Sequence, residues 1–140
     1  MPIKNYTTKI PALQTVGEIQ GILEAHGAKK IMMDYGDDGK VKSVVFALET
    51  ATGLRGYLLP ARIDGVAAVL AKQRVKCDYD TAERVAWRIV KDWIDAKMAF
   101  LESEQAAMDE IFLPYMVNDE GHTLYNVFLE NKLKFIGMEE

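Results

Sequence analysis

The sequence predicts an α+β fold with a four-stranded, mainly antiparallel sheet in the order β-α-β-β-β and a C-terminal helical half. Two observations support this prediction. Runs of β-prone residues separated by turns fill the first part of the chain, and apolar residues at helical spacing fill the second. The 140 residues, 49% hydrophobic and 27% charged, suit one globular domain. We therefore expect a single domain over 1–140, with the sheet and one helix in 1–60 and the helical part in 61–140.

The first predicted strand spans residues 3–10, where β-prone isoleucine, tyrosine and threonine residues precede Pro11. Proline lacks a backbone donor, so it ends this run and favours an edge position in the sheet. A helix is expected over 16–26, because Thr15 opens a capping-box pattern and Gly27 provides a C-terminal stop.

Three further strands are predicted between residues 29 and 59. Glycine- and aspartate-containing turns at 36–39 and 50–53 separate them, and these residue types accept the positive φ that tight hairpins require. The middle strand, 41–48, carries apolar residues on both faces, so we expect it to be the most buried of the three.

The second half of the chain predicts helices. One spans about 62–73, and a longer one begins at a cap formed by Asp80 and runs to about Leu101, with a break near Ser103. A shorter helical segment ends at Pro114. A turn at 118–121 then leads to a last short helix that Thr123 caps and that bears Leu124, Val127, Phe128 and Leu133.

The long helix has an apolar arc far wider than the ~100° stripe that is typical of a surface helix. Two arrangements account for the extra width. Either the sheet and the neighbouring helices enclose the helix, or the side that carries Trp87, Ile94 and Met98 is an interface with another protein or a second copy. The second arrangement allows a homodimer through this helix.

The opposite side of the long helix is charged. Arg88 with Asp92 and Lys91 with Asp95 have the i,i+4 spacing of helical ion pairs, which leaves Arg84 as the main unpaired cation. A solvated, mutually paired surface is one interpretation of this side.

A basic cluster is the other interpretation. Lys72, Arg74 and Lys76 lie just before the long helix, where they would hold a phosphate while Trp87 stacks on a base. The net charge of -4 and the pI of about 5.3 argue against an extended nucleic-acid track.

Common catalytic motifs are missing from the sequence. It has no glycine-rich phosphate loop, no Gly-x-Ser-x-Gly elbow and no His-Glu-x-x-His pair, so we expect neither an enzyme nor a cofactor or metal site. His26 and His122 both suit structural positions, at a helix end and in a turn. The lone Cys77 cannot form an internal disulfide, and no apolar run is long enough to span a membrane. We therefore expect a cytoplasmic protein that does not contact membranes.

Four segments carry a resemblance to known proteins: Ile3–Thr8, Ala82–Trp93, Phe112–Tyr115 and Thr123–Tyr125. With these segments the whole chain resembles a group of small phage and mobile-element proteins that have no established function. The resemblance assigns no role to any residue. It implies a phage origin, and small non-enzymatic phage proteins often block host machinery or assist phage DNA metabolism.

The function expected from the sequence is that of a non-enzymatic, phage-type binding protein that blocks a host factor. It would be an anti-defence inhibitor, acting in the host cytoplasm on a defence protein or on its nucleotide signal. The expected partner-binding residues are Trp87, Ile94 and Met98, which would supply contact area, and Arg84, Arg88 and Lys91, which would supply polar complementarity. The alternative is a DNA- or RNA-binding accessory of phage replication or recombination that uses the segment from Lys72 to Lys91.

Overall fold

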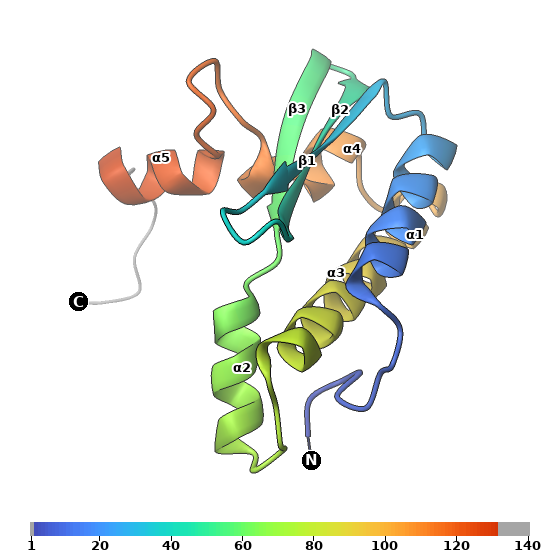
Figure 1. Cartoon of the computed structure of the whole chain (residues 1–140). Helices are drawn as coiled ribbons and strands as arrows, with labels where there is room; N and C mark the ends of the chain where they lie inside the picture. Colours follow the sequence, from blue (N-terminus) through green and yellow to red (C-terminus); the bar gives the residue numbers. More distant parts are fainter. Residues whose placement is uncertain (1, 132–140) are drawn as a thin grey trace, which may run out of the picture.

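The computed structural model describes residues 2–131. Helix α1 and helix α3 pack against each other on one side of a small sheet, and α2 packs against α3 farther along (Figure 1). The elements, in chain order, are α1 (Ala12–Ala25), β1 (Lys30–Tyr35), β2 (Val41–Thr50), β3 (Gly53–Pro60), α2 (Ile63–Lys72), α3 (Tyr79–Glu102), α4 (Met108–Ile111), the 3-10 turn η1 (Leu113–Tyr115) and α5 (Leu124–Asn131).

The sheet is antiparallel, as predicted, but within residues 2–131 it has three strands in the order β1-β2-β3. Phe46, in the middle of β2, pairs with Ile31 of β1 and Tyr57 of β3. The hairpin turns fall where the sequence places them, and Gly39 and Gly53 adopt positive φ angles of 79° and 111°. These turns give the fold its consecutive β1-β2-β3 order.

The segment 3–10, predicted as the first strand, is not a strand. The Tyr6 N–H donates to the Ile3 carbonyl at 3.3 Å, and the Thr8 N–H donates to the Asn5 carbonyl at 3.0 Å. Asn5 has a φ of 68°, a left-handed conformation that a strand cannot accommodate. The segment therefore contains a turn and adds no fourth strand to the sheet. The two neighbours of β2 in the sheet are β1 and β3.

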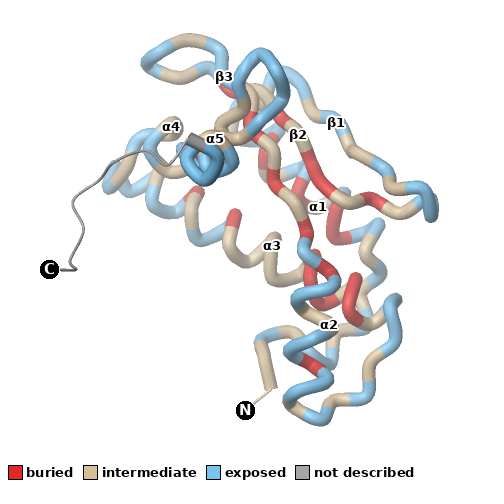
Figure 2. The backbone as a smooth tube through the Cα atoms, turned by 90° about the vertical axis from the view of Figure 1, so that its left-hand side faces the viewer, coloured by how far each residue is buried: buried red, intermediate tan, exposed pale blue. Residues whose placement is uncertain are grey.

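The core lies between the sheet and the α1–α3 pair. Val44, Phe46 and Leu48 alternate along β2, point to the same face, and are each 1% exposed. Figure 2 shows buried residues concentrated in β2, in the adjoining part of β3 and on the facing sides of the helices. The prediction that the middle strand is the most buried one is confirmed.

Helix α1 begins earlier than the predicted range of 16–26. Pro11 occupies the N-cap position, where its missing N–H leaves no donor unpaired. Thr15 lies inside the helix and is buried, so it does not cap the helix, and its hydroxyl accepts a long hydrogen bond from the Arg88 guanidinium at 3.4 Å.

Helices α2 and α3 lie close to their predicted ranges. The cap of α3 is Asp78 and not Asp80, because the Thr81 N–H donates to Asp78 Oδ1 at 2.8 Å. The helix ends at a C-cap on Ser103, near the predicted break, and Glu104 follows with a φ of 59°.

The last helix is capped as predicted. The Asn126 N–H donates to Thr123 Oγ1 at 3.2 Å, and Gly121 adopts a φ of 82° in the preceding turn. Leu133, expected on this helix, lies outside the described residues. None of the helices between residues 2 and 131 combines the length and apolar character needed to cross a membrane.

Candidate functional site

The three apolar residues expected at a partner interface lie in the core. Trp87 and Ile94 are 0% exposed and Met98 is 2% exposed, and all three belong to the cluster that packs beneath the sheet. The wide apolar arc of α3 is therefore accounted for by burial, the first of the two arrangements that the sequence allows. In this structure these side chains offer no surface to a partner or to a second copy.

The charged side of α3 faces α1. Arg88 Nη1 lies 2.8 Å from Glu18 Oε1, so its partner is on α1 and not at Asp92 as predicted. The predicted pair of Lys91 and Asp95 is present, with Nζ and Oδ2 2.8 Å apart. Glu18 reaches Arg88 because α1 packs against α3, and the residue spacing within α3 cannot predict a partner on another helix.

Asp92 is held by the N-terminal segment. Asn5 Nδ2 donates to Asp92 Oδ2 at 2.9 Å, and Lys4 Nζ lies 3.5 Å from the same oxygen. Burial alone raises the pKa of Asp92, but the Asn5 hydrogen bond and the Lys4 charge outweigh it and lower the pKa. Two of the three expected polar contact residues, Arg88 and Lys91, are thus engaged within the fold, and this side of α3 supplies internal ion pairs.

Arg84 is the least satisfied of the expected cations. Its Nη2 donates to Thr81 Oγ1 at 3.2 Å, but its buried Nε has no hydrogen-bond partner among the described residues. The indole Nε1 of Trp87 is also buried without a partner in that part of the chain. Neither atom lies on an open surface, so neither forms a ready binding site.

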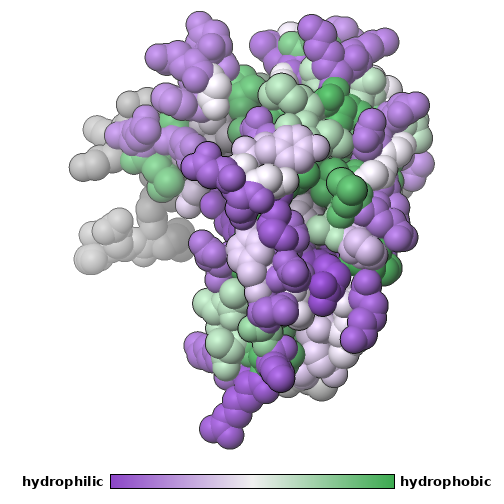
Figure 3. Space-filling model, in the orientation of Figure 1, coloured by the Kyte–Doolittle hydropathy of each residue, from purple (hydrophilic) through white to green (hydrophobic). Residues whose placement is uncertain are grey.

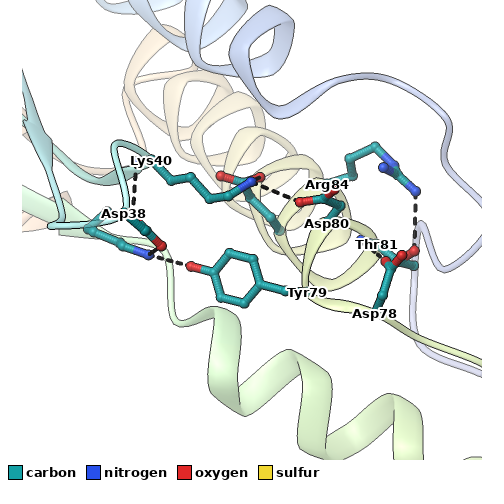
Figure 4. Close-up of polar contacts among 9 residues, drawn as sticks. Asp38, Lys40, Asp78, Tyr79, Asp80, Thr81 and Arg84 are labelled. Atoms are coloured by element: carbon teal, nitrogen blue, oxygen red, sulfur yellow. Dashed lines mark hydrogen bonds and ion pairs between the residues drawn. The ribbon is translucent and has the colours of Figure 1, made fainter.

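A polar network joins the β1–β2 turn to the start of α3 (Figure 4). Lys40 Nζ lies 2.8 Å from Asp80 Oδ1 and 3.4 Å from Glu83 Oε1. Lys42 bonds to the Tyr79 hydroxyl, and its Nζ lies 2.9 Å from Asp38 Oδ2. Both ammonium groups also lie over the Tyr79 ring, 5.4 and 4.9 Å from its centroid.

This network holds its lysines in the charged form. The hydrogen bond to the Tyr79 hydroxyl, followed by that to Asp38, raises the pKa of Lys42, and the bond to Asp80 raises the pKa of Lys40. A lysine with a raised pKa cannot act as a nucleophile or general base near neutral pH. We therefore interpret the network as a connection between the hairpin and α3.

An open concave surface with a largely apolar lining lies on the side of α3 away from its charged residues. It is one groove made of two adjoining cavities, of about 250 and 360 Å³. Figure 2 shows α5 and α2 on opposite sides of the middle of α3. Residues of all three helices line the two cavities, so the groove spans the region between α2 and α5. The first cavity is lined by Leu59, Pro60, Arg62, Val66, Ala86, Ile89, Val90, Trp93 and Tyr115. The second is lined by Leu58, Pro60, Arg62, Pro114, Tyr115, Thr123, Tyr125 and Asn126.

Aromatic rings form much of the groove wall. Trp93 meets the Tyr115 ring edge to face, with centroids 5.5 Å apart and an interplanar angle of 74°. Phe112 supports Trp93 from the core side at 5.8 Å. Tyr125 is 50% exposed and stacks on Phe128 with centroids 6.4 Å apart. The groove therefore offers partly exposed aromatic rings to a ligand.

Arg62 is the only charged residue that lines the groove in the described chain. It precedes α2 and is exposed, and its side chain forms no hydrogen bond or ion pair with the described residues, although its backbone carbonyl accepts from the Val66 N–H. A free guanidinium beside aromatic rings suits a planar ligand that carries a negative charge, such as a carboxylate or phosphate.

Hydrophilic residues cover most of the face in Figure 3, and hydrophobic residues emerge between them over α2 and between the sheet and α1.

Sequence reasoning did not find this groove. Arg62, Trp93, Tyr115 and Tyr125 come from four separate parts of the chain. The last three lie in segments that carry the resemblance, but the resemblance assigns no role to any residue. No group of three or more His, Cys, Asp or Glu residues within 2–131 is placed to hold a metal ion.

No protein-family model matches the chain, and neither a curated protein nor a solved structure matches it. The geometry of the groove therefore carries the functional argument.

Proposed function

We propose that this chain is a non-enzymatic, phage-type binding protein that blocks a host factor by holding the nucleotide signal of a defence system. The observation that supports the proposal is the unpaired Arg62 at the centre of an aromatic-lined groove. Aromatic faces bind bases and guanidinium groups bind phosphates, so both halves of a nucleotide find a partner there.

The groove suits a small ligand better than a large protein surface. Each cavity is near the lower end of the ~300–1,000 Å³ range of small-molecule sites. The residues expected to supply area to a protein partner, Trp87, Ile94 and Met98, are enclosed. Blocking a host factor by removing its signal therefore requires no large interface. The proposed place of action is the host cytoplasm.

The test is a ligand-capture experiment. The tagged protein is incubated with a deproteinised extract of host cells in which the defence system is active, washed, and heated to release bound molecules for mass spectrometry. We expect a nucleotide to be retained by the wild type and lost with Arg62→Glu. Lys29→Glu is the matched control, because Lys29 is also an exposed cation but lies outside the groove. Equal retention by wild type and Arg62→Glu would refute the site.

A second candidate is the DNA- or RNA-binding accessory. The observation that favours it is the exposure of Lys72, Arg74 and Lys76 at the end of α2. The burial of Trp87 removes the base-stacking residue expected beside them. Binding of this kind should weaken steeply as salt rises, because counterions are released, and it should depend on these three residues and not on Arg62.

A further inference from the structure

The groove has two lobes that share one cation. Pro60, Arg62 and Tyr115 line both cavities, so these residues form the boundary between them. Beyond that boundary, Trp93 lies in the first cavity and Tyr125 in the second. Each lobe therefore has its own aromatic ring, and the guanidinium lies between the lobes.

The two lobes differ in polarity. Apart from Arg62 and the aromatic residues, the first lobe is lined only by aliphatic side chains, including Val66 and Ile89. The second contains the Thr123 hydroxyl and the Asn126 amide, and the Asn126 side chain forms no hydrogen bond with the described residues. A base in the first lobe would be held by stacking alone, whereas a base in the second would also meet a donor and an acceptor.

The anionic part of a ligand has one favourable place in this groove. Asp64 is the acidic residue nearest to Arg62 in the sequence, but it lines a separate hollow. Lys42, Tyr79 and Arg62 also line that hollow. No carboxylate lines either lobe of the groove itself among the described residues. A phosphate at the boundary would therefore meet Arg62 without a competing acidic group in the lining.

We infer that the groove binds a dinucleotide, with one base in each lobe and the linking phosphate at Arg62. The inference rests on the proposed function and specifies its ligand. Stacking on an aromatic ring is largely independent of base identity, so the Trp93 lobe accepts any base. The Asn126 lobe favours adenine, because the asparagine amide complements the N6 and N7 edge of that base.

The test compares three ligands by isothermal titration calorimetry: the dinucleotide ApA, AMP and adenosine. We expect ApA to bind at least about tenfold more tightly than AMP, because it fills both lobes. AMP should in turn bind more tightly than adenosine, because only AMP carries a phosphate for Arg62.

Variants assign each part of the ligand to its lobe. Trp93→Ala should lower the affinity for ApA to that for AMP. The affinity for AMP, which binds in the other lobe, should be unchanged. Val66→Phe should have the same effect by filling the first lobe, which keeps the test valid if Trp93→Ala fails to fold. Arg62→Ala should lower the affinity for AMP to that for adenosine. The control Lys29→Ala, at an exposed lysine outside the groove, should change none of the three affinities.

The outcomes separate this inference from the proposed function. Equal affinities for ApA and AMP, with AMP binding still dependent on Arg62, would reject the two-base ligand and leave the nucleotide proposal standing. Affinity that keeps rising with longer oligodeoxyadenylate strands would also reject it, in favour of single-stranded nucleic acid. No detectable binding of ApA, AMP or adenosine at ligand concentrations up to about 1 mM would reject both the two-base ligand and the nucleotide proposal.

Discussion

The two tryptophans of α3 lie on the same helix and have opposite roles. Trp87 is fully buried beneath the sheet, in the cluster that includes Ile94. Trp93 is only partly buried, and its ring forms a wall of the groove beside Tyr115. Both belong to the same apolar arc, so helical periodicity does not distinguish them. The elements that cover the helix determine which one is available to a ligand.

Replacement of Trp87 should give the largest loss of stability. Trp87→Ala removes a fully enclosed ring from the core and leaves a cavity, and such changes cost about 3–5 kcal/mol. Urea denaturation followed by circular dichroism measures the loss, provided that the m-value is unchanged. The control is Phe100→Ala on the same helix, where the side chain is 45% exposed and the cost should be far smaller. A loss of stability for Trp87→Ala as small as that for Phe100→Ala would show that Trp87 is not a core residue.

Replacement of Trp93 should cost less stability. Trp93→Ala removes two edge-on aromatic contacts, with Phe112 and Tyr115, each worth about 0.5–1.5 kcal/mol beyond the buried area. These contacts contribute roughly 1–3 kcal/mol, and the area that the half-buried ring covers adds to that. The total loss in the same urea experiment should stay below that for Trp87→Ala, because part of the Trp93 ring is exposed. Trp93→Phe should recover part of the loss by retaining a ring. If Trp93→Ala destabilises as much as Trp87→Ala, the groove wall is part of the core and the contrast between the tryptophans fails.

The sequence predicts best the elements that depend on neighbouring residues. The hairpin turns around Gly39 and Gly53 are local, and the structure confirms β1, β2 and β3 near their predicted ranges. The same holds for α2, for the length of α3 and for the Thr123 cap. In each case the residues that determine the structure lie within a few positions of one another.

The errors arise where distant segments meet. The β-prone residues of 3–10 suggest a strand, but the Ile3 N–H donates to Gln73 Oε1 at 2.8 Å and the Asn5 amide bonds to Asp92. These contacts hold the segment against α2 and α3, and tertiary structure overrides local propensity. Arg88 pairs with Glu18 for the same reason, because α1 packs against α3. The groove depends on four such segments, so no local pattern indicates it.

The charged side of α3 provides a third region for comparison, and its contribution to stability should be present at neutral pH and lost in acid. Hydrogen bonds from Gln14 and then Arg88 lower the pKa of Glu18 below its ordinary 4.5, and the pKa of Asp92 is lowered below 3.8. A carboxylate with a lowered pKa in the folded state stabilises the protein above its unfolded pKa, and this contribution is lost as pH falls through the folded value. The melting temperature should therefore be insensitive to these groups between about pH 7 and 5 and should fall below about pH 4.5.

Asp92→Asn isolates one part of this acid dependence. The amide cannot titrate but still accepts a hydrogen bond from Asn5, so the variant should lose some stability at neutral pH and show a shallower decline in acid. Melting temperatures of wild type and variant, measured in steps from pH 7 down to about pH 3, should converge as Asp92 of the wild type becomes protonated. A constant difference across the range would show that the Asp92 carboxylate contributes through packing and not through its charge. The charge of Glu18, which lies 2.8 Å from Arg88 Nη1 and 4.0 Å from Lys91 Nζ across the contact between α1 and α3, would then account for the acid dependence on this side.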